Sequence, residues 1–253
     1  MDPIEEVRRT EEMLVQYKQR YTQVHQVRTS HPPFPLCGHD IIHQTIDYLV
    51  RASHTVRSLM EKGEYCHAAV LARPCLEWAL RIMWCRVVED GWQRIVSYLA
   101  AETLKAADAE KDQHGSSPIS DEARHTLEQM RGQSTGKIPS LKDMLTSIER
   151  KQSSALAASN VAETYAIFFK GALHQVAHAN LCYMAFEQTA SDTFRVARAI
   201  RRSGIWIINS SHDYIGMSPQ DVEAFVNEYI SGFELPDDGQ KANSADAKSR
   251  AAD

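Results

Sequence analysis

Apolar residues recur at helical spacing along most of this chain. The first run, from Ile4 to Val24, repeats at intervals of three, four and seven residues, which predicts a long amphipathic helix. Asp2-Pro3 opens it with an N-cap and a proline at the first helical position, and the prolines from Pro32 onwards end it. Further helices are expected at about 40–62, 68–86, 90–112, 120–130, 140–150, 161–184, 194–208 and 218–232.

No segment alternates apolar and polar residues as a half-buried strand does, and no stretch repeats. The predicted fold class is therefore all-α, a multi-helix bundle of roughly seven to nine helices. Residues 1–235 are expected to form a single helical-bundle domain. Residues 236–253 contain no large apolar side chain, so we expect a disordered C-terminal tail there.

Two of the predicted helices, at 68–86 and 161–184, are largely apolar, and each carries one narrow line of polar groups. The first polar row consists of Arg73, Glu77 and Arg81. The second polar row consists of Lys170, His174 and His178. Residues four apart lie on one face of a helix, so cations, a carboxylate and two imidazoles meet if the two helices are neighbours.

Three interpretations of the first polar row are open. It is a solvated ladder of ion pairs, a buried Arg–Glu pair that fixes packing, or part of a functional site. Leu80 and Trp84 fall in the same sector, so exposing the row would also expose a tryptophan. Pro74 lies inside this helix, where it removes one backbone hydrogen bond, frees the carbonyl of Val70 and is expected to kink the helix beside the row.

The second polar row contributes two histidines, the side chains whose pKa lies nearest neutrality. His174 and His178 are spaced to share one metal ion, but Gln175 stands where the zinc-protease motif has a glutamate, and no third ligand can be named. The role of general acid or base is therefore the better interpretation. No metal ion and no cofactor is expected.

Net charge, cysteine spacing and the absence of long apolar runs limit the classes of protein to which this chain can belong. A net charge of −5 gives no overall basic footprint for nucleic acid, although a local arginine cluster at 195–202 is compatible with phosphate contacts. Five scattered cysteines form no Cys-x-x-Cys pair, which is typical of free thiols in a reducing compartment. The charged N-terminus is not a signal peptide, and no apolar run is long enough to cross a membrane, so we expect a soluble cytoplasmic protein.

Other motifs that carry chemistry are absent from the sequence. It has no glycine-rich phosphate loop, no nucleophile elbow and no zinc-finger spacing. The histidines outside the second polar row have no partner pattern: His43 is expected to be exposed, and His212-Asp213 to be an ordinary turn pair. The two polar rows are thus the one place where the sequence indicates a site.

The segment 71–79 (LARPCLEWA) resembles a signature of an uncharacterised bacterial all-helical family, in which an Ala-Arg-x-x-x-Glu stretch begins a buried helix. A later helix of that family carries a tyrosine and then a histidine, and Tyr165 and the run 174–180 (HQVAHAN) match it. The resemblance covers roughly residues 40–184. Its pattern is similar to that of the abortive-infection and HEPN-like helical bundles of prokaryotic defence and toxin systems.

This resemblance implies a helical bundle that forms a homo-oligomer, in its simplest form a dimer. It also implies that the polar cluster of the bundle cleaves RNA without a metal. The HEPN nuclease motif places an arginine, a polar residue and a histidine along one helix. Here Lys170 stands where that arginine is expected before His174, and a lysine does not fork around a phosphate as an arginine does. Arg73 is then the candidate to supply the guanidinium from the neighbouring helix.

The leading hypothesis is a HEPN-like protein of a bacterial defence or toxin system that acts on RNA as a metal-independent ribonuclease. His174 or His178 is its general acid or base, Arg73 and Lys170 stabilise phosphate charge, and Glu77 orients a partner group. The alternative is a non-enzymatic interaction or regulatory module with a protein partner, in which the polar rows only fix helix packing. A small-ligand pocket beside Pro74 is a third hypothesis.

Overall fold

The computed structural model describes residues 2–24, 38–134, 136–151 and 190–230. Within these ranges the chain forms eight α-helices, one 3₁₀ turn and no strand. The predicted all-α multi-helix bundle is therefore confirmed. The helix expected at 161–184 and the tail expected at 236–253 lie outside the described residues.

The helices follow one another with short connections through most of the described chain. In order they are α1 (Pro3–Val24), α2 (Gly38–Glu61), α3 (Tyr65–Val87), α4 (Gly91–His114), α5 (Asp121–Arg131), α6 (Leu141–Lys151), α10 (Ala190–Ser211), the 3₁₀ turn η3 (His212–Ile215) and α11 (Pro219–Ile230).

Local capping chemistry explains where several helices begin and end. The backbone N–H of Ile4 donates to Oδ1 of Asp2 at 3.0 Å, which caps α1, and the N–H of Ala123 donates to Oγ of Ser120 at 3.2 Å, which caps α5. Gly63 follows α2 with a φ of 78°, a left-handed conformation that glycine adopts without a Cβ penalty. The capping residues are visible in the sequence, so the predicted first residues of these helices lie close to the observed ones.

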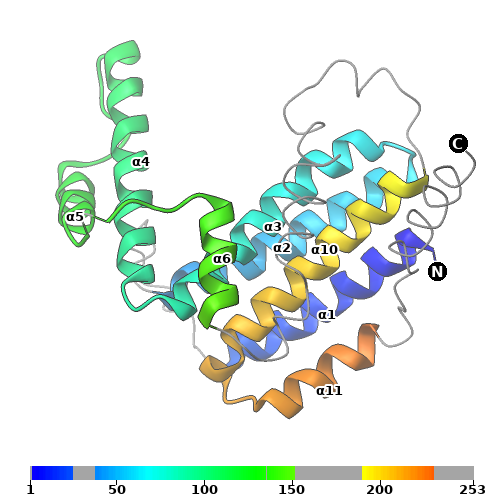
Figure 1. Cartoon of the computed structure of the whole chain (residues 1–253). Coiled ribbons are helices and arrows are strands. Elements are labelled where there is room, and N and C mark those ends of the chain that lie inside the picture. Colours follow the sequence, from blue (N-terminus) through cyan, green and yellow to red (C-terminus); the bar gives the residue numbers. More distant parts are fainter. Residues whose placement is uncertain (1, 25–37, 135, 152–189, 231–253) are drawn as a thin grey trace, which may run out of the picture.

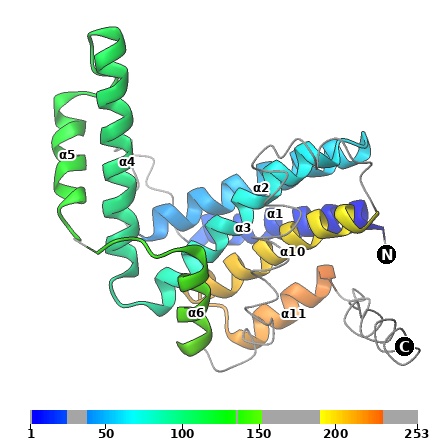
Figure 2. The same ribbon diagram turned by 45° about the horizontal axis from the view of Figure 1, so that its top comes forward.

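Helices α1, α2, α3 and α10 lie side by side and form the body of the molecule, with α11 along its lower edge in Figure 1. Helices α4 and α5 form a hairpin that projects away from this body, here called the arm, and α6 returns from it to α3 (Figure 2). Helix α3 packs against α2, α4, α6 and α10. Helix α3 is thus the helix that contacts both the body and the arm.

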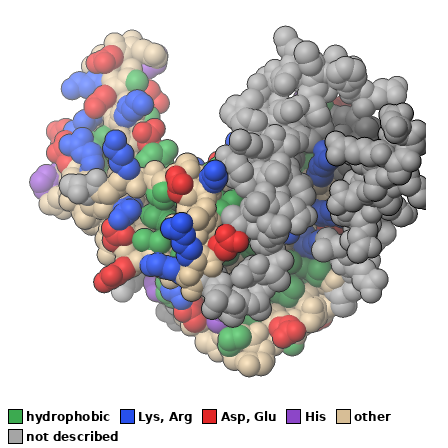
Figure 3. All heavy atoms as spheres, in the orientation of Figure 1, with side chains coloured by type: hydrophobic (Ala, Val, Ile, Leu, Met, Phe, Trp, Pro, Cys, Tyr) green, Lys and Arg blue, Asp and Glu red, His purple; other side chains and the backbone are tan. Residues whose placement is uncertain are grey.

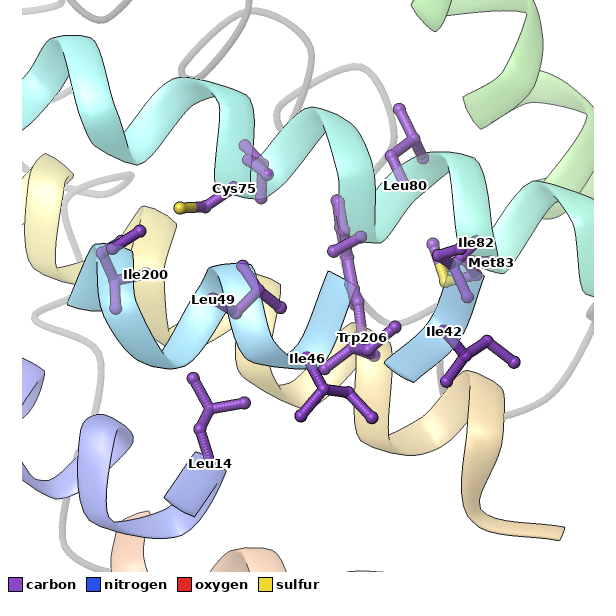
Figure 4. Packing of buried hydrophobic residues seen from close by; sticks show 14 of the residues in the cluster. Leu14, Ile42, Ile46, Leu49, Cys75, Leu80, Ile82, Met83, Ile200 and Trp206 are labelled. Atoms are coloured by element: carbon purple, nitrogen blue, oxygen red, sulfur yellow. The ribbon is translucent and has the colours of Figure 1, made fainter. Parts of the chain in front are cut away.

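The hydrophobic core joins the helices of the body. Leu14 of α1, Leu49 of α2, Met83 of α3 and Trp206 of α10 lie in the apolar layer between these helices (Figure 4). The cluster continues into the arm, where Leu104, Leu127 and Met130 fill the seam between α4 and α5. None of the described helices combines the length and the apolar character that crossing a bilayer requires.

Candidate functional site

The first polar row lies along α3, as its spacing predicts. Nε of Arg73 donates a hydrogen bond to Oε1 of Glu77 at 2.8 Å. On the other side of the same carboxylate, Oε2 of Glu77 lies 3.8 Å from Nη2 of Arg81, beyond hydrogen-bond length. Glu77 is therefore held tightly by Arg73 and only loosely by Arg81.

The burial of the row decides between two of its interpretations. The side chains of Arg73, Glu77 and Arg81 are 13%, 21% and 21% exposed. In a solvated pair of the same spacing on α1, Arg8 and Glu12 are 44% and 50% exposed. The first polar row is therefore not a solvated ladder, and it is not sealed from water either.

The neighbours of the row differ from those expected from the sequence. Leu80 and Trp84 are buried in the core, and the partial exposure of the row does not extend to Trp84. Trp78 lies beside the row instead: Cζ of Arg81 is 5.0 Å from the centroid of its ring, a cation–π contact. The helix turns Trp84 toward the core and leaves Trp78 half-buried next to Arg81.

Helix α3 continues across Pro74 without interruption, from Tyr65 to Val87. A proline at this position deprives the carbonyl of Val70 of its helical donor. Val70, four residues before Pro74, is one of the exposed large hydrophobic residues of the described chain, so this part of α3 reaches water. Pro74 is therefore tolerated at the edge of the row without a break in the helix.

The second polar row, Lys170, His174 and His178, lies outside the described residues, and so does Tyr165. The meeting of the two rows therefore stays a prediction. Among the described residues, no group of three or more histidine, cysteine, aspartate or glutamate side chains is placed to hold a metal ion.

Sequence reasoning missed a polar cluster at the end of α3. Nη1 of Arg86 donates to the hydroxyl of Tyr214 at 2.9 Å, and Nη2 forms an ion pair with Asp213. The ring of His39 meets the ring of Tyr214 edge-on at a centroid distance of 4.3 Å. Asp213 lies in the turn η3, as expected, and in addition pairs with Arg86 of α3. No sequence pattern links residues so far apart.

The environment of His43 also differs from the sequence expectation. Its side chain is half-buried, not exposed. Burial and, to a lesser extent, the neighbouring Lys18 ammonium lower the pKa of His43. Lys18 forms an ion pair with Asp47. A histidine that is kept neutral in this way packs between α1 and α2 rather than serving as a surface charge.

A second buried Arg–Glu pair joins two helices of the body. Nη1 of Arg201 on α10 lies 3.1 Å from Oε1 of Glu6 on α1, and the two side chains are 15% and 6% exposed. Burial raises the pKa of Glu6 and lowers the pKa of Arg201, so loss of water outweighs mutual attraction for both groups. Oε1 of Glu6 has no hydrogen-bond donor of good geometry among the described residues.

Two of the cysteines of α3 are too deeply buried to supply a nucleophile. Cys75 and Cys85 are free thiols buried in the core. Burial raises the pKa of Cys75 to about 12 and also raises that of Cys85. Both therefore stay protonated at neutral pH, and a thiol of this kind is chemically inert.

Charge on the visible face of the molecule is mixed. In Figure 3, lysine and arginine side chains alternate with aspartate and glutamate side chains over the arm. That mixture differs from the single-sign patch that steers nucleic acid by charge alone.

Comparison with models of protein families, with curated protein sequences and with solved structures finds no match for this chain. The fold and the first polar row therefore carry the functional argument.

Proposed function

We propose that this chain is a cytoplasmic HEPN-like helical protein of a bacterial defence or toxin system that cleaves RNA without a metal ion, as a homo-oligomer. The observation that carries the proposal is the first polar row on α3. It combines two guanidinium groups with one carboxylate, half-buried but open to water, on the central helix of the bundle. Such partly desolvated cations stabilise a negatively charged transition state better than surface cations do.

In the proposed reaction the 2′-hydroxyl of RNA attacks the adjacent phosphorus, and the bond from phosphorus to the 5′-oxygen breaks. His174 or His178 accepts the proton of the 2′-hydroxyl, and the other, in its protonated form, donates a proton to the departing 5′-oxygen. The products are a 2′,3′-cyclic phosphate and a 5′-hydroxyl end. Arg73 and Lys170 stabilise the charge that develops on the phosphate oxygens, and Glu77 orients Arg73 through their 2.8 Å hydrogen bond.

The test is cleavage of end-labelled single-stranded RNA by the purified full-length protein in the presence of a chelator. Arg73→Ala and His178→Ala are each expected to lower the rate by roughly 100-fold or more, as removal of a charge-stabilising or acid–base group does. Arg51→Ala is the control, because it removes the same charge from a side chain that is 73% exposed on α2. Full activity in folded Arg73→Ala and His178→Ala protein would rule the proposal out.

A non-enzymatic interaction module is the second candidate, and the projecting arm favours it. Helices α4 and α5 extend away from the body, and Tyr98 of α4 is an exposed aromatic side chain of the kind that protein interfaces use. This candidate predicts that no RNA is cleaved and that Glu77→Ala lowers the melting temperature without changing any activity.

A further inference from the structure

The three side chains of the first polar row are not equally engaged. The carboxylate of Glu77 takes its hydrogen bond from Arg73 at 2.8 Å and leaves Arg81 at 3.8 Å. Nε of Arg81 is buried and has no hydrogen-bond partner among the described residues. A buried N–H without an acceptor is costly. The Arg81 side chain as a whole is 21% exposed, so its guanidinium gains from a further acceptor that approaches from solvent.

Three other arginines among the described residues have a carboxylate within hydrogen-bond distance, which Arg81 does not have. Arg57 lies 2.8 Å from Glu11, Arg94 lies 2.7 Å from Asp90, and Arg124 lies 2.7 Å from Asp108. Arg81 is 21% exposed, and its carboxylate partner within the described ranges, Glu77, lies at 3.8 Å, about one ångström further away. Its guanidinium is therefore both reachable from solvent and short of an acceptor.

The indole ring of Trp78 restrains the orientation of the Arg81 guanidinium. The guanidinium carbon stands 5.0 Å from the centre of the indole ring, one helical turn earlier on the same face of α3. Stacking on an aromatic face restrains the rotation of a guanidinium and leaves its N–H edge free to take up a planar, two-point contact. A phosphate oxygen pair is the acceptor that this edge fits best.

The charge of the row selects the kind of phosphate. Two guanidinium groups and one carboxylate leave a net charge of one positive unit in a half-buried site. A phosphodiester carries one negative charge and neutralises the row. A terminal phosphate monoester carries nearly two, and the Glu77 carboxylate beside Arg81 repels the second one.

We propose that Arg81, held against Trp78, is the anion-binding residue of the first polar row and that it contacts an internal phosphodiester of single-stranded RNA. This inference rests on the proposed function for the identity of the ligand. It assigns Arg81 a different task from Arg73, whose Nε is committed to Glu77. Arg81 binds the ground-state phosphodiester, whereas Arg73 acts on the charge that develops during cleavage.

The experiment measures binding separately from cleavage. A fluorescent single-stranded oligonucleotide with 2′-O-methyl groups cannot undergo attack by its own 2′-oxygen, so its affinity is measured by anisotropy at one fixed salt concentration. Arg81→Lys keeps the charge but loses the planar fork, and we expect it to weaken binding roughly tenfold, the effect of losing one charge-assisted contact. Arg81→Ala should weaken it further.

Two controls distinguish a specific loss of RNA binding from a general effect of lost charge and from a folding defect. Arg51→Ala removes one positive charge from an exposed position of α2 and should change the affinity less than about twofold. Arg81→Lys guards against a folding defect in the alanine variant, because it retains a cation near Glu77. The same oligonucleotide with a 5′-terminal phosphate should bind no more tightly than one without it.

The outcomes keep the two proposals apart. If RNA is cleaved but both Arg81 variants bind the oligonucleotide as the wild type does, the role of Arg81 is overturned and the ribonuclease proposal stands. If binding depends on Arg81 but unmodified RNA is never cleaved, the ribonuclease proposal falls and the anion site stands. If the wild type does not bind the oligonucleotide at all, the role of Arg81 is overturned.

Discussion

Two arginine–glutamate systems lie inside this bundle, and they are built differently. The first polar row runs along one helix, α3, and its carboxylate shares two guanidinium groups at unequal distances of 2.8 and 3.8 Å. The pair of Glu6 and Arg201 bridges two helices, α1 and α10, and its side chains are only 6% and 15% exposed. One system keeps contact with water and one hardly does.

The difference between these two systems shows that burial of an arginine–glutamate pair does not by itself indicate a functional site. In the pair of Glu6 and Arg201, loss of water shifts the pKa of both groups toward their neutral forms, which is the cost of sealing charges between helices. In the first polar row, Nε of Arg81 has no hydrogen-bond partner among the described residues, while the Arg81 side chain is 21% exposed to solvent. The sealed pair is suited to fixing α1 against α10, and the open row to receiving a ligand.

Breaking the sealed pair should have the largest effect on stability. Arg201→Ala leaves the Glu6 carboxylate buried without its cation, and we expect a loss of about 3–5 kcal/mol in the free energy of unfolding. Urea denaturation followed by circular dichroism measures it. A double variant, Glu6→Leu with Arg201→Met, should recover most of the loss, because both charges are then replaced by apolar groups. A loss below about 1 kcal/mol in Arg201→Ala would show that the pair is solvated after all.

Removing the shared carboxylate of the open row should cost less. Glu77→Ala leaves Arg73 and Arg81 without their common anion, but water reaches both guanidinium groups, so we expect a loss of about 1–2 kcal/mol. The same denaturation experiment measures it beside Arg201→Ala. If Glu77→Ala is as damaging as Arg201→Ala, the row is a packing device and the interaction-module candidate gains.

The contrast also explains which parts of the structure the sequence predicted. The helices of the described ranges were predicted because each carries its own signals, such as Asp2 before α1 and Ser120 before α5. The first polar row was predicted for the same reason, since four-residue spacing within one helix fixes which side chains meet. Within a helix, sequence distance determines spatial distance.

Contacts between helices had no such signal. Glu6 and Arg201 are separated by most of the chain, and so are Arg86 and Asp213, which the sequence presented as unrelated charges. Their pairing depends on the rotation of each helix about its axis, and the core packing sets that rotation. The same dependence explains why Trp84 turned out to be buried while Trp78 lies beside Arg81.

The buried pair of Glu6 and Arg201 should make the stability of the protein depend on pH. Burial raises the pKa of Glu6 above its model-compound value of 4.5. The protonated carboxyl is then favoured in the folded state, so its contribution to stability is fully present below pH 4.5 and is lost as the pH rises through the raised pKa. Glu6→Gln cannot titrate there.

We therefore expect the stability of the wild type relative to Glu6→Gln to fall as the pH is raised from about 4 to 7. Thermal unfolding of both proteins across this range measures the difference. A relative stability that instead increases with pH would mean that attraction to Arg201 and Arg198 exceeds the cost of burial, and that the pair of Glu6 and Arg201 stabilises the charged form.

The smallest effect on stability is expected from the solvent-exposed ion pairs of α1. Arg8 contacts Glu5 and Glu12 at helical spacing, but its side chain is 44% exposed, and its partners keep their hydration when it is removed. Arg8→Ala should lower the melting temperature by less than about 2 °C, and added salt should narrow the difference. A larger or salt-insensitive loss would contradict the ranking, because ion pairs would then contribute equally whether or not water reaches them.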